Sequence, residues 1–227
     1  KNRLIPKVVH TAIPIMDTAM TDTAALLRLM SWLSPIFPIG GFAYSAGLEQ
    51  AVADNLVSDR HDLHAWIASS ITQGALWNDA VIFCAAHRVE EVRDLCLALA
   101  TAAERHREML DQGAAFYDAA KHWVEEESMG PRKTPLPVIV ARAATLEGIA
   151  AKPSIAAYLH AFVSNQLQCA IRLSVTGQNG AAQTLAALET IIEDAASRAA
   201  DSTLNKLGGL SMSSVIAAMN LHYLTPR

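Results

Sequence analysis

Possible metal ligands are the first side chains whose type and spacing could support chemistry. Cys84 and His87 are three positions apart, as are His61 and His64, and Asp62 lies beside the second pair. In a helix, this spacing brings both members of a pair to one face. A catalytic zinc site takes three protein ligands and a structural one takes four, and the sequence identifies no further partner. We therefore predict no metal site and interpret these residues as packing and surface groups.

Nucleophilic and nucleotide chemistry finds no better support. Ser34, Ser45 and Ser164 lie in no G-x-S-x-G turn, the setting that exposes a serine nucleophile above a sheet. No cysteine lies in a markedly basic stretch that would lower its pKa. The Gly40-Gly41 pair is not part of a phosphate-binding G-x-x-x-x-G-K sequence. We predict a protein that is not an enzyme and that holds no cofactor.

The most unusual stretch of the chain runs from Ser34 to Glu49 and reads SPIFPIGGFAYSAGLE. Its two prolines stiffen the backbone, and its glycine pair allows a tight or left-handed turn. Phe37, Phe42 and Tyr44 supply large, rigid apolar surfaces. A loop of this kind either fills a core or binds a partner, and its physical chemistry alone leaves both interpretations open.

A second unusual segment is the predicted helix over residues 153–175. One stripe of this helix is formed by Ile155, Leu159, Phe162, Gln166, Cys169 and Leu173. Asn165, Gln168 and Arg172 form a polar row on an adjacent face. Buried polar groups need hydrogen-bond partners. The row is therefore either an internal hydrogen-bonded seam or a contact with a second copy or another protein.

Helical periodicity positions these groups and extends over almost the whole chain. Apolar residues recur at three- and four-residue spacing, which predicts helices over roughly 24–33, 58–71, 76–88, 89–101, 103–127, 136–149, 153–175, 181–200 and 211–224. Asp22 and Thr23 are candidate caps of the first helix, and Pro153 suits a first helical turn. No window alternates as a strand would. We predict an all-α, single-domain bundle of about eight to ten helices over residues 22–227, with residues 1–21 as a flexible or artificially added segment.

Composition excludes several classes of function. The chain has 227 residues, a formal net charge of −4 and no long basic run, so nucleic-acid binding is not expected. The uncharged stretches 29–48 and 153–171 carry prolines and glycines or several polar side chains, which argues against membrane spans. Three widely spaced cysteines fit free thiols in a reducing compartment. We predict a cytoplasmic protein without membrane contact.

The segment from Ser34 to Glu49 closely resembles the signature of the urease accessory protein F family (UreF), which is close to S-P-x-F-P-x-G-x-F-x-Y-S-x-G-L-E. A second similar block runs from Ala156 through Arg172 to Gln178. A third, weaker one contains ERHRE at 104–108 with Gln112-Gly113, and residues 221–227 resemble the start of the family's C-terminal tail. The resemblance extends over about residues 26–227.

This resemblance implies an all-helical, commonly dimeric adaptor that is not itself an enzyme. Proteins of the family act with the accessory protein UreD, also called UreH, and with the GTPase UreG to deliver nickel to apo-urease. The implied role is to regulate GTP-dependent nickel delivery. The alternative is a metallochaperone that holds nickel itself through Cys84, His87 or the pair His61 and His64. An unrelated helical enzyme is a third, weaker interpretation.

The resemblance also suggests which residues contact partners. They are Phe37, Pro38, Gly40, Gly41, Tyr44, Ser45, Glu49, Arg172, Gln178 and Arg227, with Tyr44 as the expected anchor because a tyrosine buries its ring while its hydroxyl stays hydrogen-bonded. Two departures bear on this expectation. Ala46 stands where relatives commonly have histidine, and the sequence stops at Arg227, short of the usual tail. We expect either change to weaken assembly without altering the fold.

Overall fold

The computed structural model describes residues 18–208, with side-chain environments from Thr23 onward. Its described part is helical and contains no strand, which confirms the predicted all-α bundle. The α-helices are α1 (Thr18–Trp32), α2 (Leu48–Ala53), α3 (Arg60–Gln73), α4 (Ala75–His87), α5 (Arg93–Ala98), α6 (Ala103–Ala120), α7 (Leu136–Leu146), α8 (Ala151–Arg172) and α9 (Gln178–Ala200). Three 3₁₀ turns, η1 (Gly41–Ala43), η2 (Glu126–Met129) and η3 (Leu204–Lys206), complete the set.

Several helix boundaries differ from the sequence-based expectation. The first helix begins at Thr18, so Asp22 and Thr23 lie inside it and do not cap it. The short helix α2 was not predicted, the helix expected over 89–101 shrinks to α5, and the one expected over 103–127 ends at Ala120. The helix expected over 211–224 lies outside the described residues.

Local signals explain the best-predicted helices. The side chain of Asp59 accepts a hydrogen bond of 2.9 Å from the backbone N–H of Asp62 and so caps α3. Gly74 lies between α3 and α4. Pro137 and Pro153 lie in the first turns of α7 and α8, where the missing N–H of proline breaks no helical hydrogen bond.

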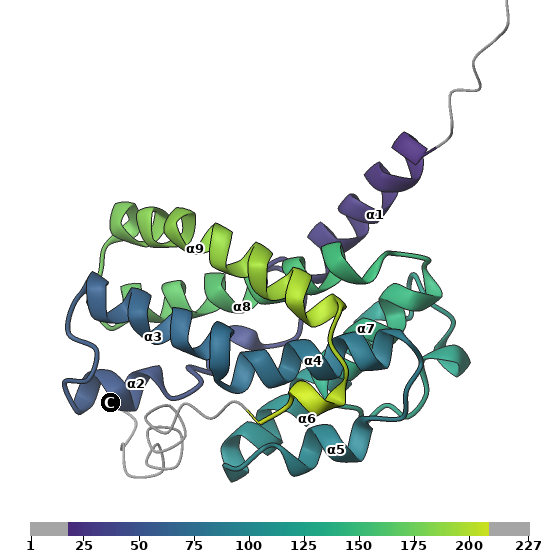
Figure 1. Ribbon diagram of the computed structural model, residues 1–227, viewed down its shortest axis with the longest axis horizontal. Coiled ribbons are helices and arrows are strands. Elements are labelled where there is room, and N and C mark those ends of the chain that lie inside the picture. Colours follow the sequence, from purple (N-terminus) through teal and green to yellow (C-terminus); the bar gives the residue numbers. More distant parts are fainter. Residues whose placement is uncertain (1–17, 209–227) are drawn as a thin grey trace, which may run out of the picture.

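Helix α4 forms the centre of the bundle. Every residue from Leu76 to Ala86 is buried, as expected for a helix that is apolar on nearly all sides. It packs against α3, α7, α8 and α9. In Figure 1, α3 and α4 cross the middle of the molecule, with α8 and α9 on one side and α5 and α6 on the other, while α1 extends away from the body. Within residues 18–208, no helix combines the length and the apolar character that crossing a bilayer requires.

The chain between α1 and α2 lies against α8, with η1 contacting that helix. Helix α6 packs closely on the segment before α7, because a Cβ atom at Gly113 would collide with the backbone oxygen of Thr134. The three blocks that resemble the UreF family therefore lie on the loop before α2, on α8 and on α6. These elements build the candidate site.

Candidate functional site

The loop between α1 and α2 takes a backbone path that only certain residues accommodate. Gly40 and Gly47 have φ angles of 69° and 88°, in the left-handed region that glycine enters freely. Ala46 also lies there, with φ of 48°, although its Cβ atom makes this conformation unfavourable by about 1–2 kcal/mol. The surrounding contacts must hold this residue in place, so the loop has a defined shape.

Phe37 fixes the first half of this loop in the core. Its side chain is 7% exposed, and its ring centroid lies 5.4 Å from that of Phe116 and 5.9 Å from that of Trp123. Ile36 and Phe42 do the opposite, with 91% and 71% of their surfaces exposed. The loop therefore combines a core-filling residue with residues available to a partner. Phe37 fills the core, whereas Ile36 and Phe42 face solvent.

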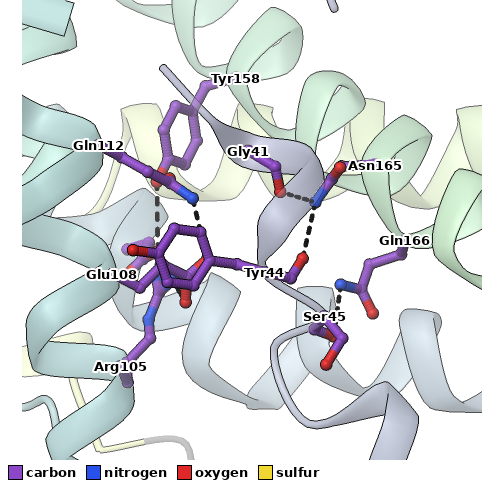
Figure 2. Close-up of polar contacts among 10 residues, drawn as sticks. Gly41, Tyr44, Ser45, Arg105, Glu108, Gln112, Tyr158, Asn165 and Gln166 are labelled. Carbon is purple, nitrogen blue, oxygen red and sulfur yellow. Dashed lines mark hydrogen bonds and ion pairs between the residues drawn. The ribbon is translucent and has the colours of Figure 1, made fainter. Parts of the chain in front are cut away.

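Helix α8 holds the second half of the loop through its side-chain amides (Figure 2). The Asn165 Nδ2 group donates to the carbonyl oxygens of Gly41, over 2.9 Å, and Tyr44, over 3.1 Å. The Gln166 Nε2 group donates to the carbonyl oxygen of Ser45 over 2.8 Å. The carbonyl oxygens of Gly41 and Ser45 also accept from the backbone N–H groups of Tyr44 and Leu48, so the amides add a second bond there and supply the bond to the carbonyl oxygen of Tyr44.

Arg172 continues this row about two turns further along the same face of α8. Its Nη1 group donates to the carbonyl oxygen of Phe42 over 2.8 Å, so the guanidinium supports the backbone beneath an exposed aromatic ring. Arg172 and Gln168 are both exposed. The bonds of Asn165, Gln166 and Arg172 thus form a hydrogen-bonded seam between α8 and the loop, which is buried at Gln166 and reaches solvent at Arg172. Gln166, which the sequence pattern assigned to the apolar stripe, belongs to this seam.

Tyr44 connects the loop to α6. Its hydroxyl donates to Asp111 Oδ2 over 3.2 Å. Burial raises the pKa of Tyr44, and the negative charges of Asp111 and Glu108 raise this pKa further. The phenol therefore stays protonated and remains a hydrogen-bond donor.

A cluster of buried charges lies next to Tyr44 (Figure 2). Arg105 forms ion pairs with Asp79 and Glu108, the latter over 3.1 Å between Nη1 and Oε2. Gln112 Nε2 donates to Glu108 Oε1 over 3.2 Å, and the Tyr158 hydroxyl donates to Asp79 Oδ2 over 3.3 Å. The cluster joins α4, α6 and α8, so it also fixes the position of the helices around the loop.

In this cluster the single cation of Arg105 pairs with two carboxylates, and this arrangement explains the pKa shifts of Arg105 and Glu108. Burial alone would lower the pKa of Arg105, but Asp79 and Glu108 outweigh it and raise this pKa well above its usual value. Burial raises the pKa of Glu108, because Arg105 compensates only part of the penalty for desolvating its charge. Burial and the charge of Asp79 likewise raise the pKa of Tyr158.

Cys84 and His87, the pair considered as metal ligands, are both engaged in contacts within the protein. Cys84 is fully buried, and burial raises the pKa of its thiol to about 11, whereas metals bind the thiolate. One ring nitrogen of His87, Nε2, lies 2.7 Å from the carbonyl oxygen of Ile149. This arrangement offers no shared metal position.

The structure groups His61 with Asp59 and Asp62, and not with His64 as the sequence spacing suggested. Among the residues that the structure describes, Asp59, His61 and Asp62 alone bring three ligand atoms within 4.8 Å of one another. Both carboxylates already have backbone partners at the start of α3: Asp59 accepts from Asp62, and Asp62 accepts from the N–H and hydroxyl of Ser58. The two carboxylates of this trio are therefore used to cap the start of α3.

The remaining candidate residues are distributed unevenly. Pro38 and Gln178 are exposed, the latter as the first residue of α9, while Gly40, Gly41 and Glu49 are half-buried. Ser45, within the loop, is buried. Arg227 lies outside the described residues. Asp79 and Tyr158 were missed as members of the site, although a lone carboxylate in the apolar helix α4 was a usable signal, because buried charges are normally paired.

The fold and the site define an all-α bundle that holds an aromatic loop in a fixed conformation by means of two other helices. The family model described as UreF matches residues 57–189, more than half of the chain. The chain therefore belongs to the UreF family of urease accessory proteins.

Curated relatives support this assignment over most of the sequence. The urease accessory protein UreF of Rhizobium etli (strain CIAT 652) is 44% identical over 219 residues, covering 92% of this chain and 98% of that protein. The UreF of Mesorhizobium japonicum is 46% identical over 211 residues, covering 88% and 95%. That of Agrobacterium fabrum is 43% identical over 210 residues, covering 89% and 94%.

Proposed function

We propose that this chain is a non-catalytic adaptor that assembles with UreD/UreH and the GTPase UreG, and thereby regulates GTP-dependent nickel delivery to apo-urease. We also propose that it acts in the cytoplasm, consistent with its three free cysteines. We propose a homodimer as its active form. The observation that carries this proposal is the loop from Ser34 to Gly47, which leaves Phe42 exposed while its backbone is held from α8.

Fixing the loop before binding favours a protein interface. A loop that is already ordered loses less conformational entropy on association, so more of its contact energy appears as affinity. An aromatic side chain standing on such a loop has the properties of an interface anchor. Phe42 is 71% exposed, and its backbone carbonyl is bound by Arg172. We therefore assign the partner contact to Phe42 and the neighbouring Tyr44, and the supporting role to Asn165, Gln166 and Arg172.

Co-expression of the chain with UreD, UreG and apo-urease, followed by size-exclusion chromatography, tests the proposal. The wild-type chain should elute in a complex with UreD and UreG. Phe42→Ser should shift it to the position of the free chain, because the exposed ring is lost while the hydrogen bonds from α8 to the loop backbone remain. Leu56→Ser is the matched control, since Leu56 is also exposed, at 52%, but lies in the segment between α2 and α3. Elution of the wild type alone beside every component would contradict the proposal.

A further inference from the structure

A cavity of about 330 Å³ lies between the aromatic loop and helices α3, α4, α6 and α8. Its volume falls in the range of sites that enclose a small ligand or a protein side chain. The loop residues 43–47 form one side of this cavity, and the charged cluster around Arg105 forms another. The cavity is thus continuous with the loop to which the proposed function assigns partner binding.

The walls of the cavity combine aromatic rings with carboxylates. Tyr44, Trp66 and Phe162 contribute the rings. Four acidic side chains line the cavity, Glu49, Asp79, Glu104 and Glu108, against the two basic ones of Arg105 and Arg107. Aromatic faces together with nearby carboxylates attract a cation that carries an apolar stem.

The charge of Arg105 is already used within the protein, because its guanidinium pairs with both Asp79 and Glu108. Arg107 is exposed, so water screens its charge. Asp79 and Glu108 share this single cation, and Glu49 and Glu104 add two further carboxylates, so by formal charge the lining is negative.

This charge distribution excludes other ligands. An anion would meet the excess of carboxylates. A bare metal ion needs several ligand atoms that converge, and within the described part of the chain no group of three in this cavity does so. A purely apolar ligand would strip water from the carboxylates without replacing its hydrogen bonds. A positively charged group on a flexible apolar stem satisfies both the rings and the acids.

We propose that this cavity receives a lysine or arginine side chain presented by a partner protein. A protein source is favoured over a free amine because residues 43–47 belong both to the cavity wall and to the proposed docking loop. A partner seated on Phe42 is therefore positioned to place a basic side chain in the cavity. This proposal rests on the proposed adaptor function and adds the chemistry of the contact.

Two variants of α3 test the cavity itself. Ser70 lines it, whereas the adjacent Ser69 does not. Ser70→Phe should fill the space and lower the affinity for UreD or UreG by at least about tenfold, as expected for loss of an interface anchor. Ser69→Phe should leave this affinity unchanged. Glu49→Gln, which removes a charge from the wall, should weaken binding and reduce its dependence on salt, with Glu189→Gln on α9 as the control. Thermal unfolding identifies any variant that fails to fold.

A small-molecule probe tests the chemistry without a partner. N-acetyl-arginine amide should shift the NMR signal of the Trp66 indole N–H at millimolar concentration, a range in which about 4 kcal/mol of binding energy is detectable. N-acetyl-norleucine amide, which lacks the charge, should not shift it, and Ser70→Phe should abolish the shift.

The two experiments separate the possible failures. If the wild type binds partners, Ser70→Phe binds them equally well and the arginine probe causes no shift, the cavity proposal is overturned while the adaptor function stands. If the probe binds but Ser70→Phe retains full affinity for the partners, the ligand is a free amine and the protein source is overturned. If the wild type binds no partner at all, the adaptor function fails, and the partner side chain with it.

Discussion

The side-chain amide of Asn165 donates to the main-chain carbonyl oxygen of Tyr44 over 3.1 Å, although the two residues are 121 positions apart in the chain. The same amide also binds the carbonyl oxygen of Gly41. One residue of α8 thus holds both ends of the 3₁₀ turn η1 in the aromatic loop. This contact links the fold to the proposed function, because it holds the loop in one shape before any partner binds.

Replacing Asn165 should therefore loosen the loop more than the bundle. Asn165→Leu keeps a similar volume but removes the side-chain donor of the Tyr44 carbonyl and one of the two donors of the Gly41 carbonyl, which keeps its bond from the Tyr44 N–H. Losing the partner of a buried acceptor costs about 1–3 kcal/mol. We expect faster hydrogen exchange of the loop amides and weaker partner binding. Gln168→Leu on the exposed face of the same helix is the control. Unchanged exchange in the loop would show that the amide does not hold it.

Removing the cation of the buried cluster should destabilise the whole bundle. Arg105→Met leaves Asp79 and Glu108 without their shared partner, and breaking a buried ion pair from one side costs about 3–5 kcal/mol. Urea denaturation measures the loss. The triple variant Arg105→Met, Asp79→Asn and Glu108→Gln should recover much of it, because no unpaired charge remains. Equal stability of the single variant and the wild type would refute the role of the cluster.

Glu108 should give the stability of the protein a specific dependence on pH. Its pKa is raised above the usual value of 4.5 by burial, so the folded state holds this proton at pH values where the unfolded state has lost it. The contribution of Glu108 is fully present below pH 4.5 and is lost as pH rises through the folded-state pKa. Glu108→Gln removes this term, so its stability relative to the wild type should increase with pH across this window. A stability difference that is independent of pH would contradict the assignment.

Nickel binding by the isolated chain should not depend on Cys84. The thiol is fully buried with its pKa raised to about 11, and His87 Nε2 already contacts the Ile149 carbonyl oxygen. Equilibrium dialysis of wild type and Cys84→Ser with nickel should give the same result. Tight, stoichiometric binding that disappears in Cys84→Ser would instead support the metallochaperone alternative.

The fold class was predictable because helical periodicity is local. The predicted helix ends are wrong where a contact between distant residues or an unusual backbone angle determines the end of a helix. Val89 has a φ angle of 65°, which ends α4 and shortens the helix expected after it. Trp123 packs on Phe37 over 5.9 Å between ring centroids, and the helix expected to run through Trp123 ends at Ala120. Propensity cannot anticipate such contacts.

The candidate site was predictable only in part, for a related reason. The loop was identified from its own residues, and Arg172 and Asn165 from their position in an apolar helix. Which helix faces which is set by packing of the whole bundle, so the pairing of Arg105 with Asp79 and the link from Tyr44 to Asp111 could not be derived from spacing.

The nickel content of urease purified from cells that lack this chain tests the central claim most directly. We predict that urease from such cells contains little nickel, that expressing the wild-type chain restores it, and that Phe42→Ser, although folded, does not. Urease fully loaded with nickel in the absence of the chain, or equally well in the presence of Phe42→Ser, would contradict the claim that this protein works through the contacts of its exposed loop.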